Sequence, residues 1–191
     1  TQRHEKAQAQ IINHLLDVSR IITGKLQLNV APVDLAPVIR ATFESVRIAV
    51  EAKSIRLDVQ IDPAVGPVAG DSDRIQQVLW NLLSNALKFT PKGGRIWVRL
   101  KRKWSRAVIE VADNGVGIDS EFLPYAFERF HQEDAGTTRR YGGLGLGLAI
   151  SRNIVEAHGG TITAYSEGKD RGSTFTVLIP LLAVRIESDR S

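Results

Sequence analysis

The chain has 191 residues, of which 43% are hydrophobic, so it can bury the core of one or two small domains. Its 25 lysine and arginine residues against 21 acidic residues give a net charge of +4, which suits an anionic ligand but falls short of a nucleic-acid-binding composition. The lack of cysteine excludes disulfides, thiolate nucleophiles and cysteine-ligated zinc. No apolar run is long enough to span a bilayer, so we expect no contact with a membrane. Because the net charge is modest, we expect no contact with nucleic acid either.

The first part of the chain is predicted to be one long helix over residues 2–23, which Gly24 ends. A lone helix cannot bury its apolar stripe, so we expect a partner helix from a second copy or from upstream sequence. The chain also lacks methionine, which leads us to expect a fragment or a processed chain. The residues of the stripe are Ile11, Leu15, Val18 and Ile22.

The next elements alternate between helices and strands. After an extended connection over 25–33, Asp34 is the predicted N-cap of a helix that runs to residue 53, and a strand follows over 55–61. A hairpin is expected over 95–103 and 106–112, with its basic tip exposed to solvent. A short helix near 122–127, a long loop over 133–145, a helix over 146–158 and strands over 161–166 and 173–181 complete an α+β pattern.

The central helix begins after the predicted N-cap Asp71 and ends before Pro91. Six apolar residues at helical spacing predict that one face packs on the core: Ile75, Val78, Leu79, Leu82, Leu83 and Ala86. A second stripe on the same helix is polar, with amides that suit a hard cation and a lysine that suits phosphate. The alternative interpretation of this polar stripe is a solvated helix flank. The residues of the polar stripe are Gln77, Asn81, Asn85 and Lys88.

Two glycine motifs lie further along the chain. In the first, Asp113 ends a strand and precedes Gly115 and Gly117; its carboxylate could accept a hydrogen bond from an exocyclic amine such as that of adenine. The second opens a helix, where backbone N–H groups suit phosphate oxygens, and Arg139 and Arg140 precede it. The alternative for the first motif is an ordinary turn, and the alternative for the second is that its glycines act only as hinges. The second motif comprises Gly143, Gly145, Gly147 and Leu148.

Taken together and in this order, these segments resemble the ATP-binding catalytic domain of sensor histidine kinases. Residues 81–89 resemble the family's N box, 113–117 its first glycine box, 127–130 its F box, 143–147 its second glycine box, and 172–175 its closing segment. Residues 15–26 resemble the second helix of the dimerisation and phosphotransfer hairpin. The resemblance divides the chain into a hairpin helix over 1–27, an ATP-binding domain over 28–182 and a tail over 183–191.

The resemblance implies a fold and a set of ligand contacts. The fold is a two-layer α/β sandwich (the Bergerat ATP-binding fold of the gyrase and histidine-kinase superfamily), with a mixed sheet, helices on one face and one long helix in front. Asn85 would ligate magnesium, with Asn81 near the phosphates and metal, and Lys88 would meet phosphate. Asp113 would bind the adenine amine, supported through water by Thr174. The two glycine motifs and the two arginines would surround ATP, the arginines on a mobile lid, although Leu144 stands where many members carry threonine.

The implied function is transfer of the γ-phosphoryl group of Mg-ATP to a histidine on the first hairpin helix, and onward to an aspartate of a response-regulator receiver domain. The family also implies a cytoplasmic domain and a homodimer of the full-length protein. The family's acceptor box is missing, because the leucine and proline expected after the acceptor histidine do not follow His4. Both His4 and His14 lie at positions of the second hairpin helix. We therefore expect no acceptor histidine in this chain. His131 is predicted to be a loop residue, and His158 a helix C-terminal residue favoured by the dipole.

Three other functions compete with histidine phosphorylation. ATP hydrolases of this superfamily carry a glutamate general base at the position of Asn81, and asparagine cannot take that role. A nucleotide-binding module without chemistry would be expected to have lost a ligand, yet Asn85, Asp113 and the glycines are present. Serine kinases that share the fold are disfavoured by the hairpin-type helix at the start of the chain.

Overall fold

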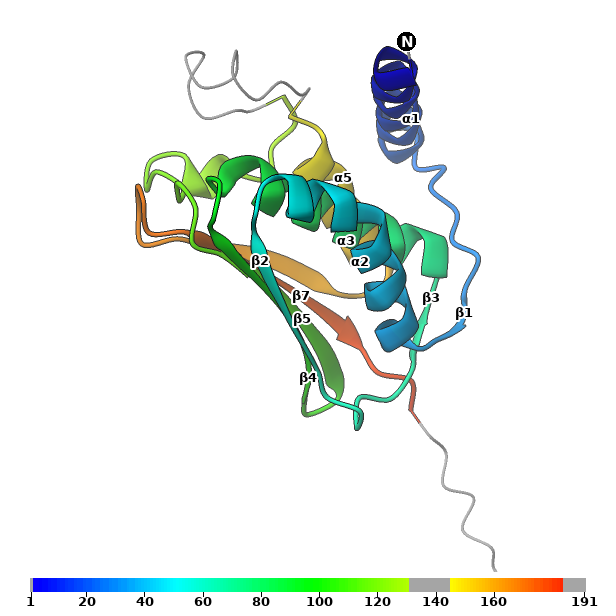
Figure 1. Ribbon diagram of the computed structural model, residues 1–191. Helices are drawn as coiled ribbons and strands as arrows, with labels where there is room; N and C mark the ends of the chain where they lie inside the picture. Colours follow the sequence, from blue (N-terminus) through cyan, green and yellow to red (C-terminus); the bar gives the residue numbers. More distant parts are fainter. Residues whose placement is uncertain (1, 131–144, 184–191) are drawn as a thin grey trace, which may run out of the picture.

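The computed structural model of the chain describes residues 2–130 and 145–183, which form a two-layer α+β sandwich preceded by a long helix (Figure 1). One layer is a five-stranded sheet in the order β2-β4-β5-β7-β6. Strands β4 (Arg95–Lys103) and β5 (Arg106–Asp113) form an antiparallel hairpin, and β2 (Arg56–Ile61) runs parallel to β4. On the other side, β7 (Ser173–Pro180) pairs antiparallel with β5 and with β6 (Thr161–Tyr165). The predicted mixed sheet is confirmed.

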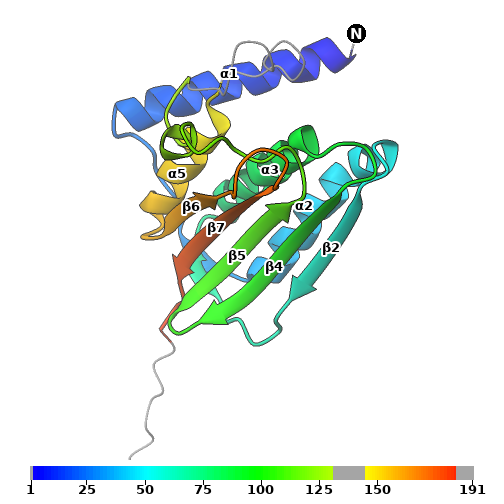
Figure 2. The ribbon, with the colours of Figure 1, turned by 90° about the vertical axis from the view of Figure 1, so that its left-hand side faces the viewer.

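The second layer consists of α2 (Leu35–Ala52), α3 (Ser72–Phe89) and α5 (Gly147–Ala157). All three lie on one face of the sheet, and Figure 2 shows the other face open toward the viewer. Asp34 and Asp71 cap α2 and α3 as predicted, because each carboxylate accepts hydrogen bonds from backbone N–H groups of the first turn. The short helix expected after the hairpin is a single 3₁₀ turn, η1 (Leu123–Tyr125).

The core lies between the two layers. All six residues of the apolar stripe predicted on α3 are buried there, and Leu82 is completely inaccessible to solvent. Their burial supplies the main driving force that holds α3 on the sheet. The sheet contributes the inward-facing residues of its inner strands, among them Ile96, Val98, Ile109, Val111, Val177 and Ile179.

A small second sheet was not predicted. Strands β1 (Ala31–Val33) and β3 (Val68–Gly70) pair antiparallel at the edge of the sandwich, and Val68 and Val33 are buried. Three residues are too few to show a period, and the pairing joins segments far apart in the sequence. This small sheet ties the connection after α1 to the entry of α3.

Helix α1 (Gln2–Ile22) crosses one end of the sandwich, where it contacts α5 (Figure 2). Val18 of the predicted stripe is buried against the domain, whereas Ile12, Leu15, Leu16 and Ile22 stay exposed. The side chains of His4, Ile11 and His14, and residues 184–191 of the predicted tail, lie outside the described part. No helix within the described ranges is both long and apolar enough to cross a bilayer.

Candidate functional site

The polar stripe of α3 does not act as one unit. Asn81 is buried, with 3% of its surface exposed, and its Nδ2 donates hydrogen bonds of 3.1 Å to the Gly147 carbonyl and to Ser151 Oγ. Ser151 Oγ in turn donates to the Gly147 carbonyl at 2.8 Å. These contacts fix the first turn of α5 on the middle of α3. Gln77 points elsewhere, because its side chain contacts Asp17 of α1.

Asn85 and Lys88 lie further along α3, toward its end. Asn85 is half-buried, and no hydrogen bond joins its side chain to another described residue. Its amide oxygen therefore suits a hard cation. Burial lowers the pKa of the Lys88 amine, which lies 4.9 Å from the centroid of the Phe89 ring. Lys53, the C-cap residue of α2, holds this end in place, since its Nζ donates to the Leu87 carbonyl at 2.5 Å.

Asp113, at the end of β5, is a buried acid, with 8% of its surface exposed. One carboxylate oxygen accepts the Gly115 N–H at 2.8 Å, and the other accepts Ser173 Oγ at 2.6 Å. Burial raises the pKa of Asp113, and the hydrogen bonds from Ser173 and Gly115 only partly oppose that rise. The carboxylate keeps lone pairs for a ligand donor, as an amine-binding role requires.

The support predicted for Asp113 came from Thr174, and the structure places Ser173 there instead. Asp113 is opposite Ser173 in the β5–β7 register, and Thr174 is opposite Ala112. Because side chains alternate between the faces of a sheet, Thr174 projects from the open face and Asp113 toward the helices. The choice of Thr174 was therefore one residue off. Two residues further on, Phe175 packs edge-on against Phe127 of the predicted F box, with ring centroids 6.2 Å apart.

The first glycine motif closes against the end of α3. Val116 N–H donates to the Phe89 carbonyl at 3.1 Å, and a Cβ on Gly115 would lie 2.3 Å from that same oxygen. Gly117 has a φ of +70°, and a Cβ there would lie 2.0 Å from the Gly168 carbonyl. Only glycine fits both positions. The N-box helix, Asp113 and the glycine turn thus form one continuous wall.

The second glycine motif lies partly within the described residues. Gly145 has a φ of +64° and its carbonyl accepts the Phe130 N–H at 3.1 Å, which brings the end of the F box to the start of α5. Leu146 is buried and Leu148 packs against the core. The predictions for His131, Arg139, Arg140, Gly143 and Leu144 lie outside the described residues.

His158 lies at the end of a helix, as the sequence predicted, and forms the C-cap of α5. The finding that the sequence did not indicate is its burial. Its Nε2 accepts the backbone N–H of Asp71 at 3.0 Å, and its Nδ1 lies 2.7 Å from the Ile154 carbonyl. Nδ1 must therefore carry the proton and Nε2 a lone pair, which is the neutral ring. Helical spacing could not reveal this contact, because it joins residues 87 apart.

Gathered around the end of α3 are an amide without a described partner, a buried carboxylate, a lysine and two glycine turns. This arrangement combines an acceptor for a base amine with groups for a hydrated cation and an anionic chain. Among the described residues no cluster of three histidine, aspartate or glutamate side chains could hold a metal ion. Asn85 is the residue whose chemistry and surroundings fit a magnesium ligand.

Comparison with known proteins agrees with this geometry. Residues 70–183 match the family described as histidine kinase-, DNA gyrase B-, and HSP90-like ATPase. The chain is 38% identical to the hybrid signal transduction histidine kinase D of Dictyostelium discoideum, covering 95% of this chain and 14% of that protein. It is 40% identical to the circadian input-output histidine kinase CikA of Synechococcus elongatus, covering 90% of this chain and 23% of CikA. The chain thus spans less than a quarter of either relative.

Solved structures show the same architecture. Full-length ShkA in complex with AMPPNP matches with a TM-score of 0.80 and 27% identity, over 92% of this chain and 36% of ShkA. The catalytic domain of the histidine kinase ThkA matches with a TM-score of 0.70 and 27% identity, over 80% of this chain and 97% of that domain. The chain therefore belongs to the histidine kinase-, DNA gyrase B- and HSP90-like ATPase family, and within it carries the ATP-binding domain of a sensor histidine kinase.

Proposed function

We propose that this domain transfers the γ-phosphoryl group of Mg-ATP to a histidine on a hairpin helix that is not among its own residues. The observation that carries the proposal is the state of Asn81. Its amide donates to Gly147 and Ser151 and cannot remove a proton from water. At the position where hydrolases of the superfamily have a general base, this chain has Asn81, whose amide holds α5 on α3. This difference favours transfer to an outside nucleophile over hydrolysis.

The described residues divide the work of binding ATP. Asp113 accepts the exocyclic amine of adenine, held in place by Ser173 and Gly115. Asn85 ligates magnesium, which when bound offsets the charge of the phosphate chain. Lys88 meets phosphate. Burial lowers the pKa of its amine, and a bound phosphate would favour the charged form. Arg139, Arg140 and the second glycine motif are proposed to cover the phosphates.

The acceptor comes from a partner segment. Exposed Ile12, Leu15, Leu16 and Ile22 on α1 offer an apolar stripe for the acceptor hairpin helix and for a second copy in a homodimer. A response-regulator receiver domain is the proposed final acceptor, which is supported by the solved complex of the histidine kinase ThkA with the response regulator TrrA. We place the domain in the cytoplasm, where ATP and receiver domains are found.

Calorimetry on three variants tests the assignment of the ligand contacts. Asn85→Ala should weaken magnesium-dependent ATP binding and leave magnesium-free ADP binding almost unchanged. Asp113→Ala should weaken ADP and ATP alike, by about tenfold or more, because it loses a charged hydrogen bond. Asn153→Ala is the matched control: its amide donates to Ala149 within α5, away from the site. Unchanged ADP affinity in Asp113→Ala would remove that residue from adenine binding.

The reaction is tested with radiolabelled ATP. The domain alone should show little self-labelling and slow phosphate release. Adding an acceptor hairpin of a sensor histidine kinase as a separate chain should give acid-labile, base-stable label on the hairpin, as expected of phosphohistidine. Label on His4 or His14 of the chain alone would show that an acceptor is present after all, and rapid phosphate release would favour hydrolysis.

A further inference from the structure

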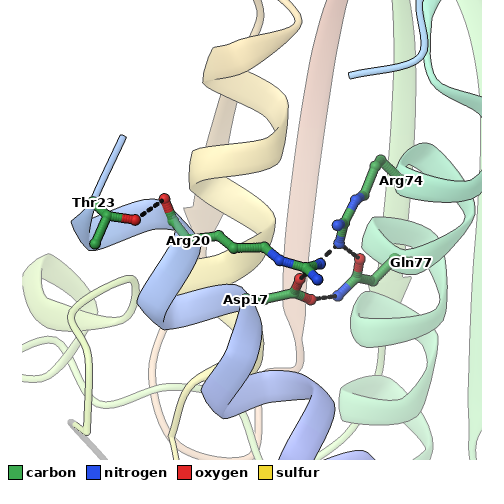
Figure 3. A network of polar contacts seen from close by, with 5 residues as sticks. All are labelled: Asp17, Arg20, Thr23, Arg74 and Gln77. Carbon is green, nitrogen blue, oxygen red and sulfur yellow. Dashed lines mark hydrogen bonds and ion pairs between the residues drawn. The ribbon is translucent and has the colours of Figure 1, made fainter. Parts of the chain in front are cut away.

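A polar network joins α1 to the first turns of α3 (Figure 3). Arg74 Nη1 donates to Asp17 Oδ1 at 2.8 Å, and Gln77 Nε2 donates to Asp17 Oδ2 at 2.7 Å. Arg74 Nη1 also donates to Gln77 Oε1 at 2.8 Å. Both oxygens of one carboxylate on α1 are thus bound by two neighbouring side chains of α3.

The network is shielded from solvent. The side chain of Asp17 is 7% exposed and that of Arg74 is 19% exposed. Removing one member leaves the opposite charge buried without its partner, which costs more than the loss of a surface ion pair. Arg20 provides a contrast on the same carboxylate: it lies 3.8 Å from Asp17 Oδ1, and its side chain is 53% exposed.

Few of the described apolar side chains of α1 are buried. Val18 is buried and Ile21 packs against the core, but Ile12, Leu15, Leu16 and Ile22 remain exposed. The connection that follows is mostly exposed, and Gly24, with a φ of +65°, has no neighbouring atom within 4 Å of the position that a Cβ would occupy. The ThkA catalytic domain, which corresponds to 80% of this chain, shows that a unit of this size folds by itself in a relative.

We propose that Asp17, Arg74 and Gln77 form a latch that fixes α1 on the ATP-binding domain, and that breaking it releases α1 while the domain stays folded. The contacts of the latch are directional, so they set one position of α1 along α3. The helix face with Asp17, Val18 and Ile21 differs from the exposed apolar face, so docking and packing with a partner helix are compatible. If the proposed kinase function holds, the latch also fixes the acceptor hairpin relative to bound ATP.

The latch is tested by the distance between α1 and the domain. Because the chain has no cysteine, Asn13→Cys on α1 and Ala41→Cys on α2 give two unique, exposed sites for spin labels. Pulsed dipolar spectroscopy should show one narrow distance with the native latch. Asp17→Ala and Arg74→Ala should each lower the docked-to-released ratio by roughly tenfold to a hundredfold. Arg20→Ala is the matched control and should leave the distance unchanged.

Two further measurements make the outcome decisive. Asp17 lies outside the ATP-binding domain, so Asp17→Ala should keep the domain's melting temperature and its affinity for a fluorescent ATP analogue. A double-mutant cycle should show coupling between Asp17 and Arg74 and none between Arg20 and Arg74. A narrow, native distance in both Asp17→Ala and Arg74→Ala would overturn the latch, as would equal broadening by Arg20→Ala. Since the readout is a distance, failure of the kinase proposal would leave this test intact.

Discussion

The hydroxyl of Ser173 and the carboxylate of Asp113 form a hydrogen bond of 2.6 Å between adjacent strands, at the end of the sheet where the glycine turn begins. The contact stabilises the ionised form of an acid that its burial disfavours. Asp113 must stay ionised to accept a hydrogen bond from a ligand, and the hydrogen bond from Ser173 favours that ionised form.

The raised pKa of Asp113 predicts a conflict between stability and binding. The folded chain holds the Asp113 proton more tightly than the unfolded chain does, so stability falls as pH rises from the ordinary aspartate range through the raised pKa. Asp113→Asn removes this loss and should raise the urea midpoint at pH 7, with a smaller gain at pH 3. The same variant should bind ADP more weakly. A lower midpoint at pH 7 would contradict the prediction.

Ser173 and Thr174 form a matched pair for testing which residue supports Asp113. Ser173→Ala removes the hydrogen bond to the carboxylate and should weaken ADP binding by about fivefold, the effect of losing roughly 1 kcal/mol. Thr174→Ala changes the open face of the sheet and should have little effect. Titration calorimetry of both variants compares them directly; a larger loss in Thr174→Ala would return the role to that residue.

These two residues show where sequence reasoning ends. Strong periodicity on α3 fixed its buried face and the position of Asn85, and the N-caps Asp34 and Asp71 marked two helix starts. The face of a β residue depends on register, so a shift of one position exchanged Ser173 and Thr174. Gln77 was grouped with the polar stripe of Asn81, Asn85 and Lys88, but its partner, Asp17, lies 60 residues away. Such long-range contacts leave no local signal.

The glycine turn gives a prediction with a close control. Gly117 and Gly93 both have positive φ values, of +70° and +79°, but only Gly117 faces a carbonyl where a Cβ would go. Gly93→Ala should therefore cost only the backbone strain, about 1–2 kcal/mol. Gly117→Ala should cost more and should also weaken ATP binding, because the turn beside Asp113 must shift. Urea unfolding with ATP titration measures both; equal losses would show that the turn can relax.

His158 predicts a loss of stability away from the ATP site. His158→Ala leaves the buried N–H of Asp71 without an acceptor and should lower the free energy of unfolding by about 1–3 kcal/mol. Gly70→Ala tests the same contact from the other side, since its Cβ would lie 2.7 Å from the imidazole ring. Gly66→Ala, with nothing within 4 Å, is the control. ATP affinity should be retained in His158→Ala as long as the chain is folded.

The strand order has a consequence for the growing chain. β7 is the last of the described strands in the sequence, yet it lies inside the sheet, between β5 and β6. Until it emerges from the ribosome, β5 presents an unpaired edge, which is the kind of surface that recruits other chains. During that interval Asp113 also lacks its hydrogen bond from Ser173, the first residue of β7. Translation products that stop before β7 are therefore expected to aggregate, and binding of ATP becomes possible only once nearly all of the domain has been synthesised.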